Sequence, residues 1–366
     1  MTAKKTGKKE TYTSDSIKKL EDHIAVRKRP GMYIGSIGSE GVMRLFYEAI
    51  GNAIDEFNAG RCKNILVRVD DGKHEIQVSD DGIGLFQDKI ETVCTKLHAG
   101  GKFENEYSQY SLGQNGVGLT VINALSENLT MIVKRDGYSW KQTFSKGIPT
   151  SKVIKGNKLS KSDGTGTTVI FTPDIEIMND ISMDVNKYLK DIISFSYLNK
   201  GLVFEFIGID DKGKKISKQL YSKNGMSDYI LTLDNKLLLT KPIVYSNKDS
   251  YEKIIRTKEK KEVHTGLMLD MECEVTMQFS KNDTNIIKTY CNGLETTSGG
   301  SHLTGFKMAM TEFFSKAVKE SNLLTKKDGN IDIIADDIQE GLVALIVVKH
   351  SDPLYKSKCL ALNKIS

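Results

Sequence analysis

Three stretches of the sequence repeat one pattern, in which short runs of alternating apolar residues flank a turn sequence. Residues 64–82 carry the turn DDGK between two such runs, whose apolar members are Ile65, Val67, Val69, Ile76 and Val78. Residues 129–144 and 202–220 repeat the arrangement around RDG and DDKG. An alternation of period two on both sides of a turn is typical of antiparallel β-hairpins. The sequence therefore predicts an antiparallel or mixed sheet, to which the β-rich run TGTTVIF adds another strand.

Helical patterns lie between these hairpins. In residues 41–60, apolar residues recur every three or four positions, at Val42, Leu45, Phe46, Ala49, Ile50, Ala53, Ile54 and Phe57. This spacing predicts an amphipathic helix that ends near Gly60. Two further helices are expected around 85–98 and 179–196. Hairpins with interspersed helices favour an α+β fold with helices over one face of a sheet, and they disfavour the strictly alternating parallel dinucleotide-binding fold.

A second region begins after residues 222–236, which are rich in turn-forming residues. The segments VHTGLMLDMECEVTMQF, IIKTYCNG and GLVALIVVKH read as strands. Between the last two, HLTGFKMAMTEFFSKAVKES reads as a helix whose apolar face comprises Leu303, Phe306, Met310, Phe313, Phe314 and Ala317. A strand–helix–strand unit predicts a right-handed crossover. We place the domain boundary near residue 223, which gives domains 1–222 and 223–366.

Composition excludes several classes of protein. No stretch approaches the roughly 18 consecutive apolar residues that a membrane span needs, and the lysine-rich N-terminus lacks the apolar segment of a secretory signal. Five scattered cysteines show no paired metal-ligand spacing, which favours a cytoplasmic protein without structural zinc. The net charge of +5 includes lysine clusters at 4–9 and 253–261. Each cluster is expected to be a solvated loop or tail, with a phosphate-backbone contact as the alternative.

Glu48, Asn52 and Asp55 share one stripe of the predicted 41–60 helix, away from its apolar face. One interpretation is a solvated helix face. The other is a site in which Glu48 activates a water molecule and Asn52 holds Mg²⁺ through its amide oxygen. A carboxylate suits a general base, and a neutral oxygen ligand suits a hard cation that is shared with phosphates.

Glycine-rich segments follow this helix. SDDGIG (79–84) comes after a predicted strand, so that its backbone can approach a ligand closely. HAGGKF (98–103) and GQNGVG (113–118) come next, and GQNGVG precedes the helix-like LTVINALS. Backbone NH groups at such a helix start can hold phosphates. Neither the Rossmann signature nor GxxxxGK[ST] is present, so neither standard nucleotide motif applies.

Six segments, taken in order, resemble those of one family. They are RKRPGMYIGS (27–36), EAIGNAIDE (48–56), SDDGIG (79–84), LHAGGKF (97–103), GQNGVG (113–118) and GTGTTVIF (164–171). The set is similar to the Bergerat-fold (GHKL) ATPases, specifically the gyrase and topoisomerase IV B subunits. The resemblance implies a GHKL α/β sandwich with an N-terminal dimerisation arm in 1–222, followed by a transducer domain in 223–366. The long helix that ends the family's transducer is missing, so the chain is expected to be a fragment or one piece of a split enzyme.

The resemblance also implies roles for individual residues. Glu48 would be the general base and Asn52 the Mg²⁺ ligand. Asp80 would accept the adenine amino group, supported by Thr167 through a bridging water. A carboxylate suits this role, since it only accepts hydrogen bonds and the amine donates. Gly84 would let the adenine ring come close.

Further residues of the resemblance belong to the lid and the second domain. Lys102 would lie over the phosphates of ATP together with Gly113, Gln114, Asn115, Gly116, Val117 and Gly118. The tyrosine beside adenine would be Tyr110, with Tyr107 as the alternative. The family's Gln-Thr-Lys motif is absent, and Lys358 is the candidate for its lysine, which contacts the γ-phosphate.

The implied function is ATP binding and hydrolysis that gates DNA strand passage in a type II topoisomerase. ATP binding would form a homodimer through the arm residues Tyr12 and Ile17. The other partners would be a topoisomerase A subunit, a metal-binding cleavage domain or chain, and DNA, with no membrane. This chain alone is not expected to cleave DNA. The alternative is a module that binds ATP and dimerises with little or no hydrolysis of its own.

Several positions depart from the family's pattern. Gly51 replaces an acid before the Mg²⁺ asparagine, which removes a polar supporting group. Ile83 replaces an arginine, so that no ion pair to Glu56 is expected. Phe86 replaces a proline. The changes at Ile83 and Phe86 are expected to reshape the entrance beside the adenine site, where aminocoumarin inhibitors bind in the family.

Overall fold

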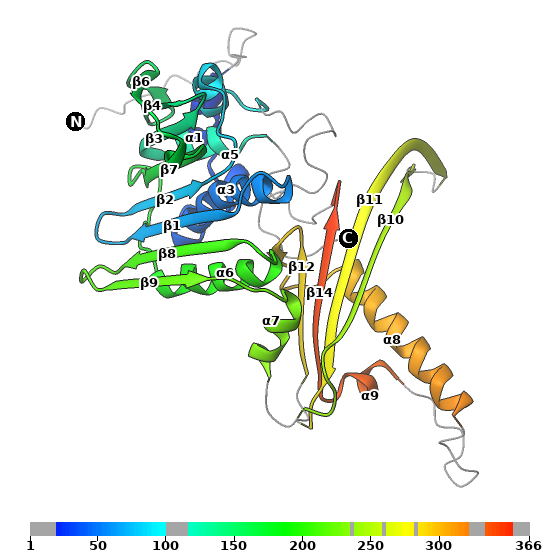
Figure 1. The fold of residues 1–366 in the computed structure, drawn as a ribbon. Helices are drawn as coiled ribbons and strands as arrows, with labels where there is room; N and C mark the ends of the chain where they lie inside the picture. The colour runs from blue at the N-terminus through cyan, green and yellow to red at the C-terminus, as the bar shows by residue number, and fades with distance from the viewer. Residues whose placement is uncertain are drawn as a thin grey trace, which may run out of the picture.

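The computed structural model of the chain describes residues 20–99, 116–234, 238–257, 261–281, 285–321 and 334–353. Their strands form two sheets, one of nine strands and one of five. The first sheet occupies the N-terminal part and the second the C-terminal part of the sequence (Figure 1). The α+β class predicted from the sequence is therefore confirmed.

The first sheet is mixed. Its order is β5 (Ile148–Pro149), β4 (Tyr138–Ser145), β3 (Ser126–Arg135), β7 (Gly166–Pro173), β2 (Glu75–Asp80), β1 (Asn64–Asp70), β8 (Val203–Ile209) and β9 (Lys215–Leu220), and β6 (Ile154–Lys158) pairs with β4. The three predicted hairpins are β1–β2, β3–β4 and β8–β9, and all three are antiparallel. Strands β1 and β8 pair in parallel.

The pattern of alternating apolar residues fixes the register of the β1–β2 hairpin. Val67 lies opposite Val78, and Val69 lies opposite Ile76. All four side chains are buried on the same face of the sheet, while their neighbours along each strand are more exposed. A shift by one residue would turn this apolar set toward solvent, so the burial of one face specifies the pairing.

Helices cover one face of the first sheet (Figure 1). The longest is α3 (Ser39–Asn58), which begins two residues before the predicted start. It ends as predicted, because the residue after its C-cap region, Gly60, has a left-handed φ of 72° and donates its NH to the carbonyl of Phe57. The other helices are α1 (Asp22–Lys28), α2 (Gly31–Ile34), α4 (Ile90–Thr95), α5 (Gly118–Ala124) and α6 (Val185–Leu198).

The second sheet has the order β10 (Ile243–Arg256), β11 (Glu262–Phe279), β14 (Leu342–His350), β12 (Ile286–Cys291) and β13 (Leu294–Glu295). Strands β12 and β14 are parallel and are connected through α8 (Ser301–Glu320) and α9 (Ala335–Gln339), as the strand–helix–strand pattern predicts. Strand β14 lies in the middle of the sheet, and seven consecutive residues of it are buried. The domain boundary near residue 223 stays a prediction.

Three expectations for this region need correction. Part of 222–236 is not a turn but the helix α7 (Met226–Leu233), because Met226, Tyr229 and Ile230 form a buried stripe against the second sheet. Part of the lysine cluster at 253–261 is not a loop but the end of strand β10, where Lys253 forms an ion pair with Asp352.

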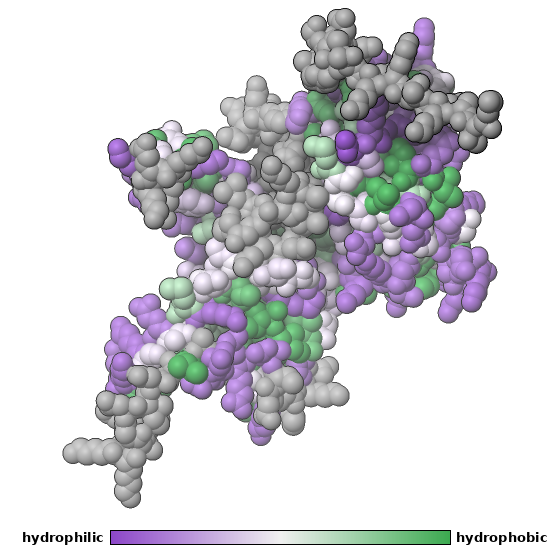
Figure 2. Space-filling model, turned by 180° about the vertical axis from the view of Figure 1, so that it is seen from behind, coloured by the Kyte–Doolittle hydropathy of each residue, from purple (hydrophilic) through white to green (hydrophobic). Residues whose placement is uncertain are grey.

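The third correction concerns α8. Met310 is buried, but Phe313 on the same predicted apolar face is 65% exposed. The face of α8 that meets the second sheet here passes through the next residue, Phe314, whose ring packs edge to face on Phe279 of β11, and it leaves Phe313 toward solvent. Elsewhere, hydrophilic side chains separate the hydrophobic patches of the rear face (Figure 2). No helix in the described ranges is long and apolar enough to cross a membrane.

Candidate functional site

The described site residues predicted from the sequence lie on three neighbouring pieces of the fold. Glu48 and Asn52 lie one turn apart on α3, and both are half-buried. Asp80 ends β2, and Thr167 lies near the start of β7, the strand beside it. The stripe on α3 does not fit a solvated helix face, because its third member, Asp55, is only 3% exposed.

The Asp80 carboxylate is fixed by two backbone donors. Its Oδ1 accepts hydrogen bonds from the NH of Gly82 at 2.9 Å and from the NH of Thr167 at 3.3 Å. Both of these NH groups bond to Oδ1, and neither bonds to the second carboxylate oxygen, Oδ2. Burial raises the pKa of Asp80 to about 7, against the lowering effect of the two NH groups. A ligand that donates a hydrogen bond to Oδ2 would favour the ionised form of Asp80.

Glycines around Asp80 are required by close packing. A Cβ on Gly166 would lie 2.0 Å from the carbonyl oxygen of Asp80. A Cβ on Gly84, whose φ is 73°, would lie 2.6 Å from the carbonyl oxygen of Lys134. The sequence predicted that Gly84 allows a ligand to approach closely. The structure adds a second reason for glycine, because β3 leaves no room for a Cβ at this position.

The Glu48 carboxylate lies against the start of α5. A Cβ on Gly118, the first residue of that helix, would lie 2.5 Å from Oε2 of Glu48. Val117 is the N-cap of α5, and Gly116 before it has a φ of 59°. The end of the predicted glycine loop therefore reaches the general-base candidate, which the spacing of the two motifs along the sequence did not reveal.

The replacement at Ile83 leaves Glu56 without a cation from position 83, but another arginine pairs with Glu56. Glu56 does have an ion pair, because Arg61 donates to its two carboxylate oxygens at 2.6 and 3.0 Å. Ile83 is 44% exposed, and its backbone NH also points to Glu56, at 3.4 Å. The ion pair from position 83 is absent, as expected, and Arg61, five residues after Glu56, supplies a cation instead.

Arg135 is a site residue that sequence reasoning missed. Its guanidinium lies over the ring of Phe86, 3.7 Å from the ring centroid, and its Nη1 donates to the carbonyl of Gly84 at 2.6 Å. Arg135 precedes the turn between β3 and β4, so the sequence showed only a hairpin turn. The cation–π contact and the hydrogen bond hold the segment that follows Asp80.

The described residues contain no group of three or more His, Cys, Asp or Glu side chains able to hold a metal ion by themselves. A Mg²⁺ ion commonly takes only one or two ligands from the protein and the rest from water and substrate phosphates. The half-buried amide of Asn52, one turn from Glu48, fits that limited role.

Several predicted residues lie outside the described residues. They are Tyr12, Ile17, Lys102, Tyr107, Tyr110, Gly113, Gln114, Asn115 and Lys358.

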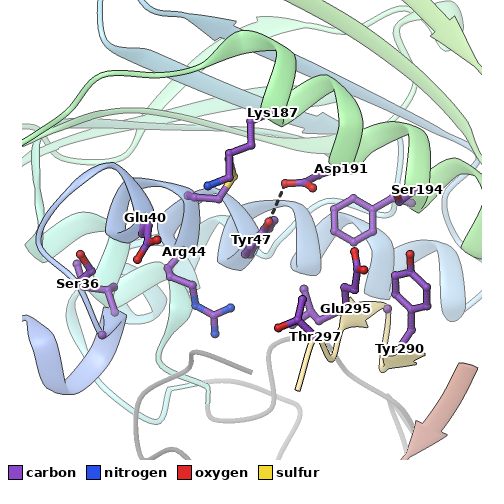
Figure 3. Close-up of a pocket in the computed structure, with 16 residues that line it drawn as sticks. Ser36, Glu40, Arg44, Tyr47, Lys187, Asp191, Ser194, Tyr290, Glu295 and Thr297 are labelled. Carbon is purple, nitrogen blue, oxygen red and sulfur yellow. Dashed lines mark hydrogen bonds between the residues drawn. The ribbon is translucent and has the colours of Figure 1, made fainter. Parts of the chain in front are cut away.

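A cavity of about 630 Å³ lies between the two sheets (Figure 3). Its walls come from α2, α3 and α6 on one side and from β12, β13 and the following residues on the other. Among the residues that the structure describes, no site residue predicted from the sequence lines it. Tyr47, the residue before Glu48, does line it, and its hydroxyl donates to Asp191 on α6.

Comparisons with known families match two parts of the chain. Residues 38–177 match the family of histidine kinase-, DNA gyrase B- and HSP90-like ATPases. Residues 225–359 match the DNA gyrase B family. The first match contains Glu48, Asn52, Asp80 and Thr167.

Two relatives illustrate the similarity in sequence. The chain is 34% identical to the DNA gyrase B protein of Metamycoplasma hominis over 357 residues, and 34% identical to that of Borreliella burgdorferi over 361 residues. Each alignment covers 95% of this chain and 52% of the relative. The chain therefore spans about half the length of these relatives.

Solved structures agree in fold. The 43K ATPase domain of Thermus thermophilus gyrase B, in complex with an aminocoumarin, superposes with a TM-score of 0.71 at 29% identity, covering 94% of this chain and 84% of that one. The topoisomerase IV ATP-binding domain of Francisella tularensis, in complex with a small-molecule inhibitor, gives 0.66 at 26% identity, covering 93% and 85%. These matches and the geometry above show that the chain has the GHKL ATPase fold and is similar to DNA gyrase B proteins along nearly its whole length.

Proposed function

We propose that this chain binds ATP between α3 and the adjoining ends of β2 and β7, and hydrolyses it as the ATPase part of a type II DNA topoisomerase. The observation that carries the proposal is the fixed Asp80 carboxylate, whose Oδ1 accepts two backbone NH groups. Its Oδ2 is then available to accept from the amino group of adenine, which is a donor. Thr167 would support the base through a bridging water.

Hydrolysis needs a group that orients the attacking water and accepts its proton. Glu48 is our candidate, because its half-buried carboxylate lies against the start of α5, directly after the glycine loop. Backbone NH groups at such a loop and helix start suit phosphates. Phosphoryl transfer depends mainly on positioning and charge stabilisation, so a fixed carboxylate beside the phosphates is suited to orienting the water.

Asn52 would hold Mg²⁺ through its amide oxygen, and the ion would neutralise charge on the phosphates. Lys102, Tyr110 and the loop 113–118 would cover the bound nucleotide. Lys358 would contact the γ-phosphate from the second domain. These roles follow from the family's pattern and remain proposals.

The wider function concerns the whole enzyme. We propose that ATP binding forms a homodimer through an arm that contains Tyr12 and Ile17, and that the dimer gates DNA strand passage. The relatives are named as DNA gyrase B proteins, so we expect a topoisomerase A subunit, a metal-binding cleavage domain or chain, and DNA as partners. The cytoplasm is the expected location.

The first experiment is steady-state ATP turnover of the purified chain against protein concentration, with and without Mg²⁺. We expect the rate to rise more steeply than linearly, since the active form is a dimer. Glu48→Ala should bind ATP normally and lose turnover. Glu127→Ala, which removes an exposed carboxylate from β3, is the matched control and should turn over normally.

The outcomes separate the alternatives. Tight ATP binding without turnover in the unmodified chain would favour the binding and dimerisation module. Turnover that persists in Glu48→Ala would refute the assignment of the base. For the arm, deletion of residues 1–16 should weaken the ATP-induced dimer in sedimentation, and an unchanged dimer would reject the arm.

A further inference from the structure

Two groups of hydrogen-bonded side chains, joined to each other through the backbone of helix α6, connect the helix that carries Glu48 with the second sheet. The first begins at Tyr47 on α3, whose hydroxyl donates to Oδ2 of Asp191 on α6 at 2.7 Å (Figure 3). Tyr47 directly precedes Glu48 in the sequence, so the rotation of α3 that places one side chain also places the other.

The Tyr47 hydroxyl is firmly held. Its ring meets Phe195 of α6 edge to face, with the centroids 6.3 Å apart, and the guanidinium of Arg44 lies 5.8 Å from the ring centroid. Burial and the nearby Asp191 carboxylate raise the pKa of Tyr47, so the hydroxyl stays protonated and donates. A buried hydrogen bond to a carboxylate is stronger than one between neutral groups.

The second group begins on the next turn of α6. Ser194 lies three residues after Asp191, on the same side of the helix. Its Oγ is 3.0 Å from the hydroxyl of Tyr229 on α7, and that hydroxyl is 2.9 Å from the hydroxyl of Tyr290 on β12. The ring of Tyr229 also stacks on that of Tyr197 at 4.9 Å. Helix α6 therefore has a polar contact with α3 through Asp191 and, one turn later, a contact through Ser194 with Tyr229, which in turn contacts Tyr290 of the second sheet.

Both groups follow the wall of the cavity between the sheets. Tyr47, Asp191, Ser194 and Tyr290 all line the cavity (Figure 3). Burial raises the pKa of Asp191, and the carboxylate of Glu295 on β13 adds a smaller effect in the same direction.

The placement of Glu48 has a narrow tolerance. Its carboxylate fits against Gly118 with no room for an added Cβ, so a small rotation of α3 would change how it meets α5 and a bound phosphate. Displacements of about 1 Å can cost an enzyme on the order of 100-fold in rate. The Tyr47–Asp191 hydrogen bond fixes this rotation from the opposite element, α6.

We propose that Tyr47 is a positioning residue for ATP hydrolysis, which sets Glu48 through its hydrogen bond to Asp191, and that Ser194, Tyr229 and Tyr290 extend this control to the second sheet. The inference rests on the proposed function, since it assigns a rate effect to Glu48. It predicts that the hydroxyl of Tyr47 matters for turnover and not for nucleotide affinity.

The test compares variants of the full chain that remove single groups. We expect Tyr47→Phe to lower kcat about 10-fold, while the Kd for a non-hydrolysable ATP analogue stays within about twofold. Asp191→Ala should lower kcat as much as Tyr47→Phe does. Asp191→Asn should keep most of the kcat of the unmodified chain, because the asparagine amide oxygen still accepts the hydrogen bond from Tyr47. Tyr197→Phe is the control, since it keeps the stacked ring and removes a hydroxyl outside both groups.

A double-mutant cycle tests the connection to the second sheet. Tyr290→Phe should lower kcat by itself but add little in the Tyr47→Phe background, because both changes remove contacts that act on Glu48 through α6. If the fold-losses in kcat of the two single variants multiply in the double variant, the proposed role of Tyr290 is overturned. An unchanged kcat in Tyr47→Phe, or equal losses in Asp191→Asn and Asp191→Ala, would overturn the positioning role itself.

Amide hydrogen exchange in α3 provides a readout that does not depend on turnover. Tyr47→Phe should speed exchange around Glu48 when the ATP analogue is bound, whereas Tyr197→Phe should not. If the unmodified chain fails to hydrolyse ATP, the proposed function fails, and the exchange result still decides the inference. Unchanged exchange in Tyr47→Phe would overturn it.

Discussion

Glu48 and Gly118 are in direct contact, although 70 positions separate them in the sequence. A Cβ on Gly118 would lie 2.5 Å from Oε2 of Glu48 and 3.3 Å from its Cβ. The carboxylate therefore occupies the space that any other residue at 118 would need. In this way the first residue of α5 defines where the side chain of Glu48 can lie.

Gly118→Ala should lower ATP turnover at least about 10-fold, because the added methyl group displaces the Glu48 carboxylate. Steady-state turnover and thermal unfolding of the same preparations measure this. Gly305→Ala is the matched control, since a Cβ at Gly305 in α8 meets nothing within 4 Å. Normal turnover in Gly118→Ala would mean that Glu48 is not the base or can act from another position.

Asp80→Asn should remove nucleotide binding and stabilise the free chain at pH 8 by up to about 4 kcal/mol. The folded-state pKa of Asp80 is raised to about 7 from 3.8, so the folded chain holds this proton more tightly than the unfolded one. The contribution of protonated Asp80 to the free energy of unfolding is therefore fully present below about pH 4 and is lost as pH rises through about 7. Asparagine does not titrate and can still accept from Gly82 and Thr167.

Urea unfolding of both forms between pH 5 and pH 8 measures this effect, and equal pH dependence would contradict it. In the unmodified chain, affinity for an ATP analogue should rise as pH increases through about 7, because the ionised carboxylate is the better acceptor for the adenine amine. Calorimetric titration checks the binding, and a pH-independent affinity would move adenine recognition away from Asp80.

Arg135→Ala should weaken binding of an ATP analogue by about 3- to 10-fold. The change removes the cation–π contact with Phe86 and the hydrogen bond to the carbonyl of Gly84, which together are worth about 1–2 kcal/mol. Arg135→Lys should recover part of the affinity through its charge. Equal binding by all three forms would show that this segment is held by other contacts.

Arg27→Met should lower the free energy of unfolding by about 3 kcal/mol. Arg27 donates to Oδ2 of Asp174 at 2.7 Å, and the Asp174 side chain is 1% exposed, so the substitution leaves a buried charge with a weaker set of partners. The double variant Arg27→Met/Asp174→Asn should be more stable than the sum of the two single losses predicts. Strictly additive losses in urea unfolding would contradict a coupled pair.

The local patterns of the sequence predicted most of the fold. Alternating residues such as Val67 and Val78 specified the first hairpin, and the apolar spacing of α3 specified its buried face. Helix α7 was not recognised, because only three buried residues mark it among turn-forming neighbours. The exposure of Phe313 could not be predicted, since the spacing shows which residues share a face and not whether anything covers that face.

The candidate site was open to prediction only where motifs name residue types, as for Glu48 and Asp80, whose roles stay predictions. It was not predictable where contacts form between distant segments. Arg135 reads as part of a turn, and Tyr47 reads as one more aromatic residue of a helix. Their partners, Phe86 and Asp191, are far away in the sequence, so no local spacing reports these contacts.

Strand β1 lies between β2, its hairpin partner, and β8, whose first residue, Val203, pairs with Asn64 in parallel. During synthesis, β1 and β2 emerge long before β8, so one edge of β1 stays open while most of the first domain is being made. The unpaired backbone NH and CO groups of an open, apolar strand edge can pair with strands of other chains, which leads to aggregation. Shortened versions that stop before Val203 should therefore aggregate, and an expressible first domain should extend at least through β9, to Leu220.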